Sequence, residues 1–273
     1  MENNKEYKKH MRAVEKNGFN LNQVPEEFIT QEMCNIAMFQ EGMNGAIIQF
    51  IPNEFRTKEI CEASMKGYGE FLSEVPKKLR TAEMCEIAVN YAGFMLKYVP
   101  EELKTYELCL IAVNDGSWVL EYVPEKYKTM ELCEIAVKDS GYNLKYVPLE
   151  LRTKELCDLA INGFGVLILV PEELRTPELC KVAIDYNGMA LEFVPTEFRT
   201  EQLCEQAVTQ NPYALQFVPS EHRGIEMCEL ALNHVDYDFK DEFLESYVPE
   251  AFQEEVLNDL DIETPKKIVE RGR

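Results

Sequence analysis

The sequence has little positive charge for its length. Its 273 residues include 28 Lys and Arg against 49 Asp and Glu, which gives a net charge of −21 at pH 7. General binders of nucleic acid or of anionic membrane surfaces need an excess of positive charge, so we expect neither activity. No stretch approaches the roughly 18 apolar residues of a membrane span, and residues 1–12 are charged rather than apolar. These absences predict a soluble, cytoplasmic protein that binds neither nucleic acid nor membrane directly.

The patterns of catalytic and metal sites are missing as well. The sequence has only three histidines, His10, His222 and His234, and no C-x-x-C pair occurs. Phosphate-binding loops and zinc motifs are absent. A nucleophilic cysteine needs a base beside it, and no cysteine has sequence neighbours that distinguish it from the others. The sequence therefore predicts no enzyme, no cofactor and no metal ion.

What the sequence has in abundance is periodicity. Nine cysteines follow one another at intervals of 23 to 27 residues: Cys34, Cys61, Cys85, Cys109, Cys133, Cys157, Cys180, Cys204 and Cys228. Nine prolines, each preceded by Val or Ile, keep the same intervals: Pro25, Pro52, Pro76, Pro100, Pro124, Pro148, Pro171, Pro195 and Pro219. Two independent markers with one period of about 24 residues indicate an internal repeat.

The repeat is close to T-x-E-L-C-x-x-A-V-x-x-x-G-x-x-L-x-x-V-P-x-x-L-R and occurs about ten times. A degenerate copy in residues 1–29 is the N-terminal cap, and eight core repeats occupy residues 30–223, the first with three additional residues around 41–44. Residues 224–273 form a stretched acidic last repeat and a C-terminal cap. Irregular ends are expected where a stack meets water, so we predict a single solenoid domain over residues 1–273.

Each repeat is interpreted as two short helices. The first begins after a threonine, a preferred N-cap residue, and Gly or Asn closes it, as in Asn187-Gly188. The second is shorter and ends before the proline, as Met189 to Phe193 does before Pro195. A leucine-rich repeat has a similar length, but its strand signature is absent and nothing alternates with period two. The predicted fold is an all-α solenoid (superhelix) of helix–turn–helix repeats with irregular terminal caps.

One pattern within the repeat carries a family resemblance. It is A-V-x-x-x-G-x-x-L followed by a short turn that ends in L-R, as in Ala136-Val137, Gly141, Leu144 and Leu151-Arg152. Over about residues 10–234 the chain resembles a helical-repeat family labelled as a domain of unknown function, found in bacterial and giant-virus proteins. The regular Cys and the Val-Pro pair depart from the family pattern. The resemblance implies the fold and brings no activity.

The cysteines occupy one position of the repeat. Equivalent positions of neighbouring repeats lie about one helix-packing distance apart, roughly 8–10 Å. This separation exceeds the limit of about 7 Å between the Cα atoms of a disulfide. We expect small, buried, apolar side chains at close helix contacts, which suits a reducing compartment.

A basic series precedes the helix caps: Arg56, Arg80, Lys104, Lys128, Arg152, Arg175, Arg199 and Arg223. It is either a strip for anionic partners or a set of surface ion pairs. We favour ion pairs, because glutamates such as Glu155 and Glu178 lie three positions after an arginine. Exposed pairs of this kind stabilise a fold only slightly.

Aromatic residues recur on the second helix, two positions before the proline and again four residues earlier. In an α-helix this spacing puts both sets on one face. The rings either pack between successive second helices or form a binding surface on the concave face, since Tyr and Trp are typical interface anchors. The candidate partner-binding residues are Phe94, Tyr98, Trp118, Tyr122, Tyr142, Tyr146, Phe193, Tyr213 and Phe217, with repeats 81–152 as the best candidates.

The last repeat concentrates negative charge, with eleven Asp or Glu and one Lys between Val235 and Glu263. This charge is either a solvated cap or a surface for a basic protein that imitates nucleic-acid phosphates. The candidate residues are Asp236, Asp238, Asp241, Glu242, Glu245, Glu254 and Glu255. Calcium is not expected, because the order of ligands in a calcium loop is absent.

Two functions follow as hypotheses. The first is a non-enzymatic repeat scaffold that holds a protein partner on its concave face. The second is an acidic, nucleic-acid-mimicking inhibitor of a basic nucleic-acid-binding enzyme, for example a phage anti-defence protein. Binding in the second case would weaken steeply with salt and compete with RNA or DNA.

Overall fold

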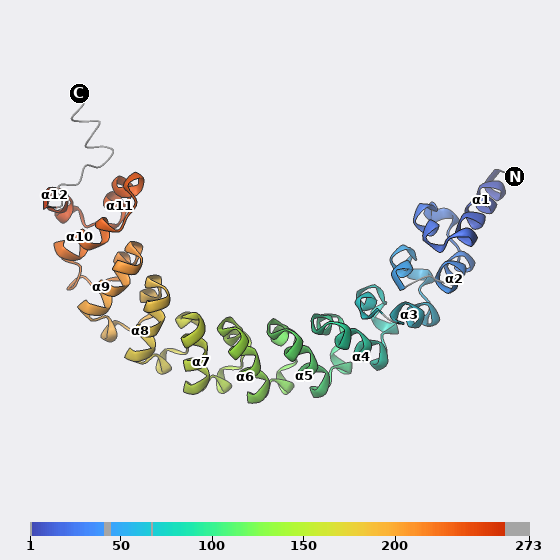
Figure 1. The fold of residues 1–273 in the computed structure, drawn as a ribbon, viewed down its shortest axis with the longest axis horizontal. Coiled ribbons are helices and arrows are strands. Elements are labelled where there is room, and N and C mark those ends of the chain that lie inside the picture. The colour runs from blue at the N-terminus through green and yellow to red at the C-terminus, as the bar shows by residue number, and fades with distance from the viewer. Residues whose placement is uncertain (1, 41–44, 67, 260–273) are drawn as a thin grey trace, which may run out of the picture. The chain divides into compact units, whose positions relative to one another are not determined.

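The computed structural model describes residues 2–40, 45–66 and 68–259, so the additional residues predicted around 41–44 and the acidic residues Asp261 and Glu263 lie outside it. The described residues form twelve α-helices and eighteen 3₁₀ helices, with no β-strand (Figure 1). The predicted all-α repeat solenoid is confirmed. None of the helices in these ranges has both the length and the apolar character needed to cross a membrane.

Each regular repeat consists of an α-helix, a six-residue 3₁₀ helix and a three-residue 3₁₀ turn. The α-helices are α1 (Glu2–Lys16), α2 (Gln31–Phe39), α3 (Lys58–Met65), α4 (Ala82–Tyr91), α5 (Tyr106–Asp115), α6 (Met130–Asp139), α7 (Lys154–Phe164), α8 (Pro177–Tyr186), α9 (Glu201–Gln210), α10 (Ile225–Asn233), α11 (Lys240–Tyr247) and α12 (Glu250–Asp259). The six-residue 3₁₀ helices are η1 (Gly18–Gln23), η3 (Gly45–Phe50), η5 (Gly69–Glu74), η7 (Gly93–Tyr98), η9 (Ser117–Tyr122), η11 (Gly141–Tyr146), η15 (Gly188–Phe193) and η17 (Pro212–Phe217). The three-residue ones are η2 (Glu26–Phe28), η4 (Asn53–Phe55), η6 (Lys77–Leu79), η8 (Glu101–Leu103), η10 (Glu125–Tyr127), η12 (Leu149–Leu151), η13 (Leu167–Leu169), η14 (Glu172–Leu174), η16 (Thr196–Phe198) and η18 (Tyr237–Phe239).

The α-helices begin where the threonines predict. The hydroxyl oxygen of Thr81 accepts a hydrogen bond from the backbone N–H of Met84 at 3.3 Å, and Thr176 does the same for Leu179 at 3.3 Å. The caps of α2, α3, α5, α7 and α9 repeat this contact. Each cap provides a partner for a backbone donor that the first turn of a helix leaves unpaired.

The glycine after the α-helix also sets how closely consecutive repeats approach. Asn187 does end α8, but with an extended backbone (φ −156°), and no left-handed glycine cap follows it. Gly93 follows α4 at the position that Gly188 has after α8. An added Cβ at Gly93 would lie 2.5 Å from the carbonyl oxygen of Ala112 in the next repeat. The absence of a side chain therefore lets consecutive repeats approach closely. The prediction that Gly or Asn closes the helix holds for α5 (Gly116), α7 (Gly165), α8 (Asn187) and α9 (Asn211), whereas α4 ends at Ala92.

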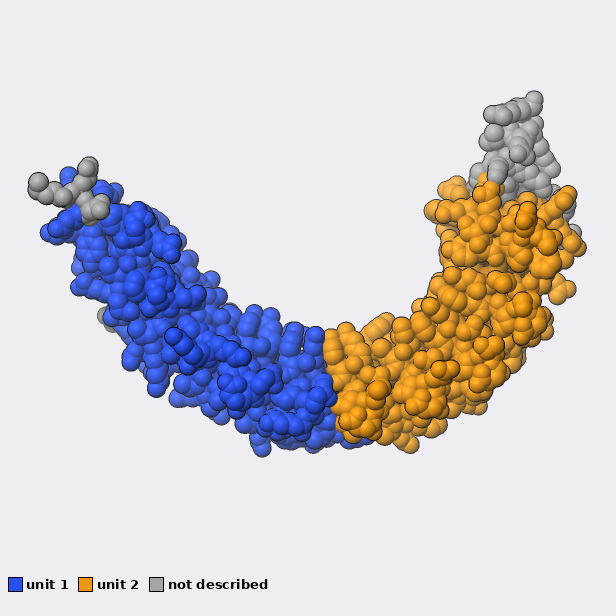
Figure 2. Space-filling view, turned by 180° about the vertical axis from the view of Figure 1, so that it is seen from behind, with its two compact units in different colours: residues 1–136 blue, residues 137–273 orange. Residues whose placement is uncertain are grey.

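The structure divides into two compact units, Met1–Ala136 and Val137–Arg273 (Figure 2). Within each unit, each α-helix packs on the next α-helix and each six-residue 3₁₀ helix on the next 3₁₀ helix, which gives two rows. In α5 to α9, Leu, Cys, Ala and a β-branched residue of the α-helix are buried between the rows together with Leu of the 3₁₀ helix, as Leu179, Cys180, Ala183, Ile184 and Leu191 are. The prediction of a single domain over residues 1–273 stays a prediction.

The basic series joins one repeat to the next. Arg175 Nε donates to the carbonyl oxygen of Val170 at 2.9 Å in its own repeat, and Nη1 donates to that of Phe193 at 2.7 Å at the end of the following 3₁₀ helix. Arg56, Arg80, Arg152 and Arg199 make equivalent pairs of contacts.

Three members of this series do form ion pairs, but with other partners than the glutamates three positions further on: Lys104 pairs with Glu101, Lys128 with Glu125 and Arg56 with Glu74. A backbone N–H and the Thr153 hydroxyl at the helix start lower the pKa of Glu155, which belongs to that cap and does not pair with Arg152. The guanidinium groups satisfy backbone carbonyls, which makes the series a link between repeats rather than a strip for anions.

The last repeat departs from the regular pattern. The extra residues before Val248-Pro249 turn the six-residue 3₁₀ helix into the eight-residue α-helix α11. Phe243 of α11 is buried, and α12 packs against α10 and α11 to cover the end of unit 2.

Candidate functional site

The predicted aromatic residues lie on the row of 3₁₀ helices and stay partly exposed. Trp118 is 50% and Tyr142 59% exposed, whereas Leu120 and Leu144, two residues further along, are fully buried. Because the helix is 3₁₀ rather than α, positions i and i+4 lie about 120° apart instead of on one face. The predicted shared face is therefore replaced by two neighbouring lines of rings.

Four of these residues form an aromatic cluster in unit 1 (Phe94, Tyr98, Trp118 and Tyr122). The rings of Phe94 and Trp118 stack with centroids 6.4 Å apart, and Trp118 meets Tyr122 edge to face at 6.2 Å. The Lys97 ammonium lies 5.5 Å from the Phe94 centroid and 4.6 Å from that of Tyr98. The cluster thus combines partly exposed rings with a cation–π contact from a lysine of the same chain.

The 3₁₀ geometry adds a set of residues that sequence reasoning missed. In a 3₁₀ helix the side chains at i and i+3 eclipse, so the residue three places before the proline lies over the first aromatic position. We call this set the exposed series: Lys97, Glu121, Lys145, Ile168, Glu192 and Gln216. Its constant distance from the proline was the signal that could have identified it.

Unit 2 contains a groove that brings two predicted residues together. Its volume is about 490 Å³, and it is lined by Tyr142, Phe164, Gly165, Val166, Leu167, Ile168, Tyr186, Asn187, Met189, Ala190, Glu192 and Phe193. The Tyr142 ring meets that of Phe164 edge to face, with centroids 6.1 Å apart. We call it the unit 2 groove. Its volume lies within the range of about 300–1,000 Å³ that is typical of ligand clefts.

A shortened repeat produces this groove. The interval from Cys157 to Cys180 is 23 residues instead of 24, and the second helix of this repeat, η13, has three residues instead of six. Gly165 takes a left-handed backbone (φ 61°), and an added Cβ would lie 2.6 Å from the Cβ of Tyr186. Both the backbone and the lack of space require glycine here.

The remaining aromatic candidates are more covered. Tyr213 packs against Phe243 and Tyr247 of α11, with ring centroids 5.4 Å apart in each case. For Tyr213 the structure therefore supports packing between successive second helices. Tyr146 and Phe217 are half-buried, and the Lys145 ammonium lies 4.5 Å from the Tyr146 centroid.

The predicted acidic residues lie at the end of unit 2. Asp238 is part of η18 and Asp236 precedes it, Asp241, Glu242 and Glu245 belong to α11, and Glu254 and Glu255 to α12. All are exposed except Asp241, which is half-buried. None of them lines the unit 2 groove.

The nine cysteines are buried free thiols, as predicted. Burial raises the pKa of each, to about 12 for Cys34 and to about 11 for Cys61 and Cys180. The thiols are therefore protonated at neutral pH, which makes them poor nucleophiles and poor metal ligands. In the ranges that the structure describes, no three His, Cys, Asp or Glu side chains are placed to hold a metal ion.

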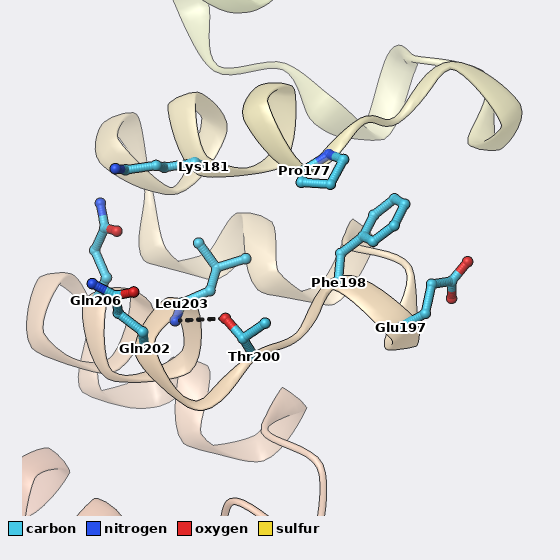
Figure 3. Close-up of a pocket in the computed structure, with 8 residues that line it drawn as sticks. All are labelled: Pro177, Lys181, Glu197, Phe198, Thr200, Gln202, Leu203 and Gln206. Carbon is cyan, nitrogen blue, oxygen red and sulfur yellow. Dashed lines mark hydrogen bonds between the residues drawn. The ribbon is translucent and has the colours of Figure 1, made fainter.

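A second groove, of about 330 Å³, lies in the row of α-helices between α8 and α9 (Figure 3). It is lined by Pro177 and Lys181 of α8, Glu197 and Phe198 of η16, and Thr200, Gln202, Leu203 and Gln206 at the start of α9. Thr200 accepts from the Leu203 N–H at 3.3 Å, which caps α9. No predicted partner-binding residue lines this groove.

Comparison with known proteins finds a similarity in two segments of the chain only to a family model. No curated protein and no solved structure matches the chain. A family model described as Domain of unknown function (DUF4116) matches residues 83–128 and 176–223, each about two repeats long. The resemblance to a helical-repeat family of unknown function, predicted from the repeat pattern, is thereby confirmed, and these two segments are similar to DUF4116.

Proposed function

We propose that this chain is a non-enzymatic repeat scaffold that holds a protein partner along the row of 3₁₀ helices, the face that we expect to be concave. The observation that supports this proposal is the recurrence of partly exposed rings at one repeat position, next to leucines that are completely buried. Rings that served only the core would be covered to the same degree as those leucines.

The physical basis is the energy of covering aromatic surface. Burying apolar area contributes about 25 cal/mol per Å², and aromatic side chains offer the largest area per residue. Trp and Tyr at the centre of a contact accordingly account for much of the affinity of many interfaces. The buried thiols agree with action in the reducing cytoplasm.

The test removes the rings and keeps the repeats. A triple variant with Tyr98→Ala, Tyr122→Ala and Tyr146→Ala should lose the partner captured by the unchanged chain, with the same far-UV circular dichroism. The matched control carries Tyr91→Ala and Ile111→Ala, which change exposed side chains of the α-helical row. Capture that survives the triple variant, or that the control abolishes equally, would show that the 3₁₀ row is not the binding face.

A second candidate function is supported by the exposed carboxylates at the end of unit 2. We propose as the alternative an acidic inhibitor that occupies the nucleic-acid channel of a basic enzyme, with α11 and α12 in contact. Replacing Glu242, Glu245, Glu254 and Glu255 by Gln should then weaken binding strongly at low salt. A complex insensitive to salt and to added oligonucleotide would contradict it.

A further inference from the structure

We infer that the unit 2 groove binds an extended segment of a basic partner protein, with an apolar side chain inserted beside Gly165 and a Lys or Arg side chain opposite Glu192. This inference rests on the proposed scaffold function and specifies the chemistry of the partner. Three features of the groove support it: a missing side chain, an apolar lining and an unbalanced negative charge.

The missing side chain is that of Gly165. Six places before the proline, the other core repeats of this region have Phe94, Trp118, Tyr142, Met189 and Tyr213. Gly165 occupies the same place, but an added Cβ would lie 2.6 Å from the Cβ of Tyr186, so this repeat contributes no side chain of that kind to the groove. Tyr142 and Met189 of the neighbouring repeats both line the groove, and an aromatic or aliphatic side chain from a partner would pack against them there.

The lining is apolar and partly wet. Val166 and Leu167 are buried, while Ile168 is 57% and Tyr186 51% exposed. Ile168 belongs to the exposed series, where the preceding repeat has Lys145 and the following one Glu192. An isoleucine at a position otherwise polar leaves apolar area in water, and covering it on binding is favourable.

The charge favours a basic segment. Glu192 is the charged side chain among the residues that line the groove, and in the described part of the chain its carboxylate makes no ion pair. Residues 137–273 contain 27 Asp and Glu against 13 Lys and Arg. Arg152, Arg175 and Arg199 donate to backbone carbonyls and keep their charges, and the excess of carboxylates over all cations of this part leaves the surrounding field negative.

The rings also suit a cation. Lys97 and Lys145 place their ammonium groups 4.6 Å and 4.5 Å from the centroids of Tyr98 and Tyr146. Phe193 occupies the repeat position of Tyr98 and Tyr146, and Glu192 occupies the position of Lys97 and Lys145. A partner's Lys or Arg can therefore contact the Phe193 ring and the Glu192 carboxylate together.

The experiment selects peptides from a random 12-residue display library on the full-length chain and measures resynthesised peptides by fluorescence polarisation. We expect the selected peptides to combine a large apolar residue with Lys or Arg. Two variants test the groove: Ile168→Lys and Glu192→Lys, each of which introduces the residue that Lys145 provides at the same position of a repeat that folds. Each should weaken binding at least tenfold, and the control Ile111→Ser, which changes an exposed side chain of the α-helical row, should leave it unchanged.

Other results would overturn the inference in distinguishable ways. Peptides that lose binding with Trp118→Ser but not with Ile168→Lys would move the contact to the aromatic cluster and leave the scaffold function standing. Acidic or purely apolar peptides, or binding insensitive to Glu192→Lys, would refute the basic partner. Failure to select any peptide that distinguishes the chain from the Ile168→Lys/Glu192→Lys double variant would refute the groove as a peptide site, while the triple tyrosine variant still tests the scaffold separately.

Discussion

The exchange of arginine for lysine in the basic series should have unequal effects at two positions that look alike in the sequence. Arg199 makes three hydrogen bonds to backbone carbonyls: Nε to Val194 at 2.8 Å, Nη1 to Phe217 at 2.7 Å and Nη2 to Glu192 at 3.1 Å. A lysine has one nitrogen at the end of a flexible chain and reproduces at best the contact with the next repeat.

Two repeats show how lysine is accommodated. Lys104 Nζ donates to the carbonyl oxygen of Tyr122 at 2.6 Å and also to the Glu101 carboxylate at 2.6 Å. Glu101 directly follows the proline, and Glu125 holds the same place for Lys128, at 2.7 Å. The glutamate carboxylate thus accepts from the lysine in place of the backbone carbonyls of the same repeat, which only a guanidinium reaches.

This comparison predicts the sizes of the effects. Arg199→Lys loses two hydrogen bonds from a charged donor, and at the low end of about 1.5 kcal/mol each, reduced by partial exposure, the loss is about 2–3 kcal/mol. Arg175→Lys should cost less than about 1 kcal/mol, because Glu172 follows the proline of that repeat and can accept from the lysine. Adding Thr196→Glu to Arg199→Lys should recover about 1 kcal/mol by supplying the missing carboxylate.

Urea unfolding followed by circular dichroism at 222 nm measures all three. The expected order of stability is unchanged chain, Arg175→Lys, Arg199→Lys/Thr196→Glu and then Arg199→Lys. Equal losses at positions 175 and 199, or no recovery with Thr196→Glu, would refute the role assigned to the residue after the proline.

Three further predictions concern packing, thiols and pH. Gly93→Ala should destabilise the fold by about 2–3 kcal/mol, because the new Cβ meets a backbone oxygen, whereas the exposed Gly163→Ala in α7, with open space around it, should raise the melting temperature slightly. At pH 8 in native buffer the nine thiols should resist a disulfide reagent, since burial raises their pKa to about 11 or 12. In urea all nine should react. Fast labelling of the folded chain would contradict their burial. Backbone N–H groups and capping threonines hold the pKa of Glu155 and Glu178 below the ordinary 4.5. The ionised carboxylates therefore stabilise the fold above pH 4.5, and this contribution is lost as the pH falls through the lowered pKa values. A Glu155→Gln/Glu178→Gln variant should show a smaller fall in melting temperature between pH 6 and pH 3.

Much of the fold could be predicted because one short pattern specifies it repeatedly. A threonine that caps a helix, a proline that ends the next one and a buried Cys-x-x-Ala-Val stripe each act within a few residues. These local rules placed every α-helix start from Thr30 to Thr200. Averaging over many copies removed the ambiguity that a single copy would have had.

Features that depend on the neighbouring repeat could not be predicted in this way. The six-residue second helix is too short for periodicity to separate 3₁₀ from α geometry. The arginines of the basic series donate to backbone carbonyls, which any residue type provides, so the sequence pointed to Glu155 instead. The clash that excludes a side chain at Gly93 involves Ala112, and only the packed stack brings the two together.

The candidate site was predicted in part. Sequence reasoning selected Trp118 and Tyr142, the two most exposed of the predicted rings, but grouped with them Tyr213, which α11 covers. It also missed the unit 2 groove, because a change of one residue in the interval between Cys157 and Cys180 does not reveal that a helix has been halved and a side chain lost at Gly165.

The most direct test of the scaffold hypothesis is site-specific photocrosslinking in living cells. A photoreactive phenylalanine analogue replaces Trp118 or Tyr142 on the 3₁₀ row and, as controls, Tyr91 or Ile111 on the α-helical row. We predict that the same partner protein is crosslinked from positions 118 and 142 and from neither control. Crosslinks from the control positions alone, or none from either row, would contradict the claim that the row of 3₁₀ helices holds a partner.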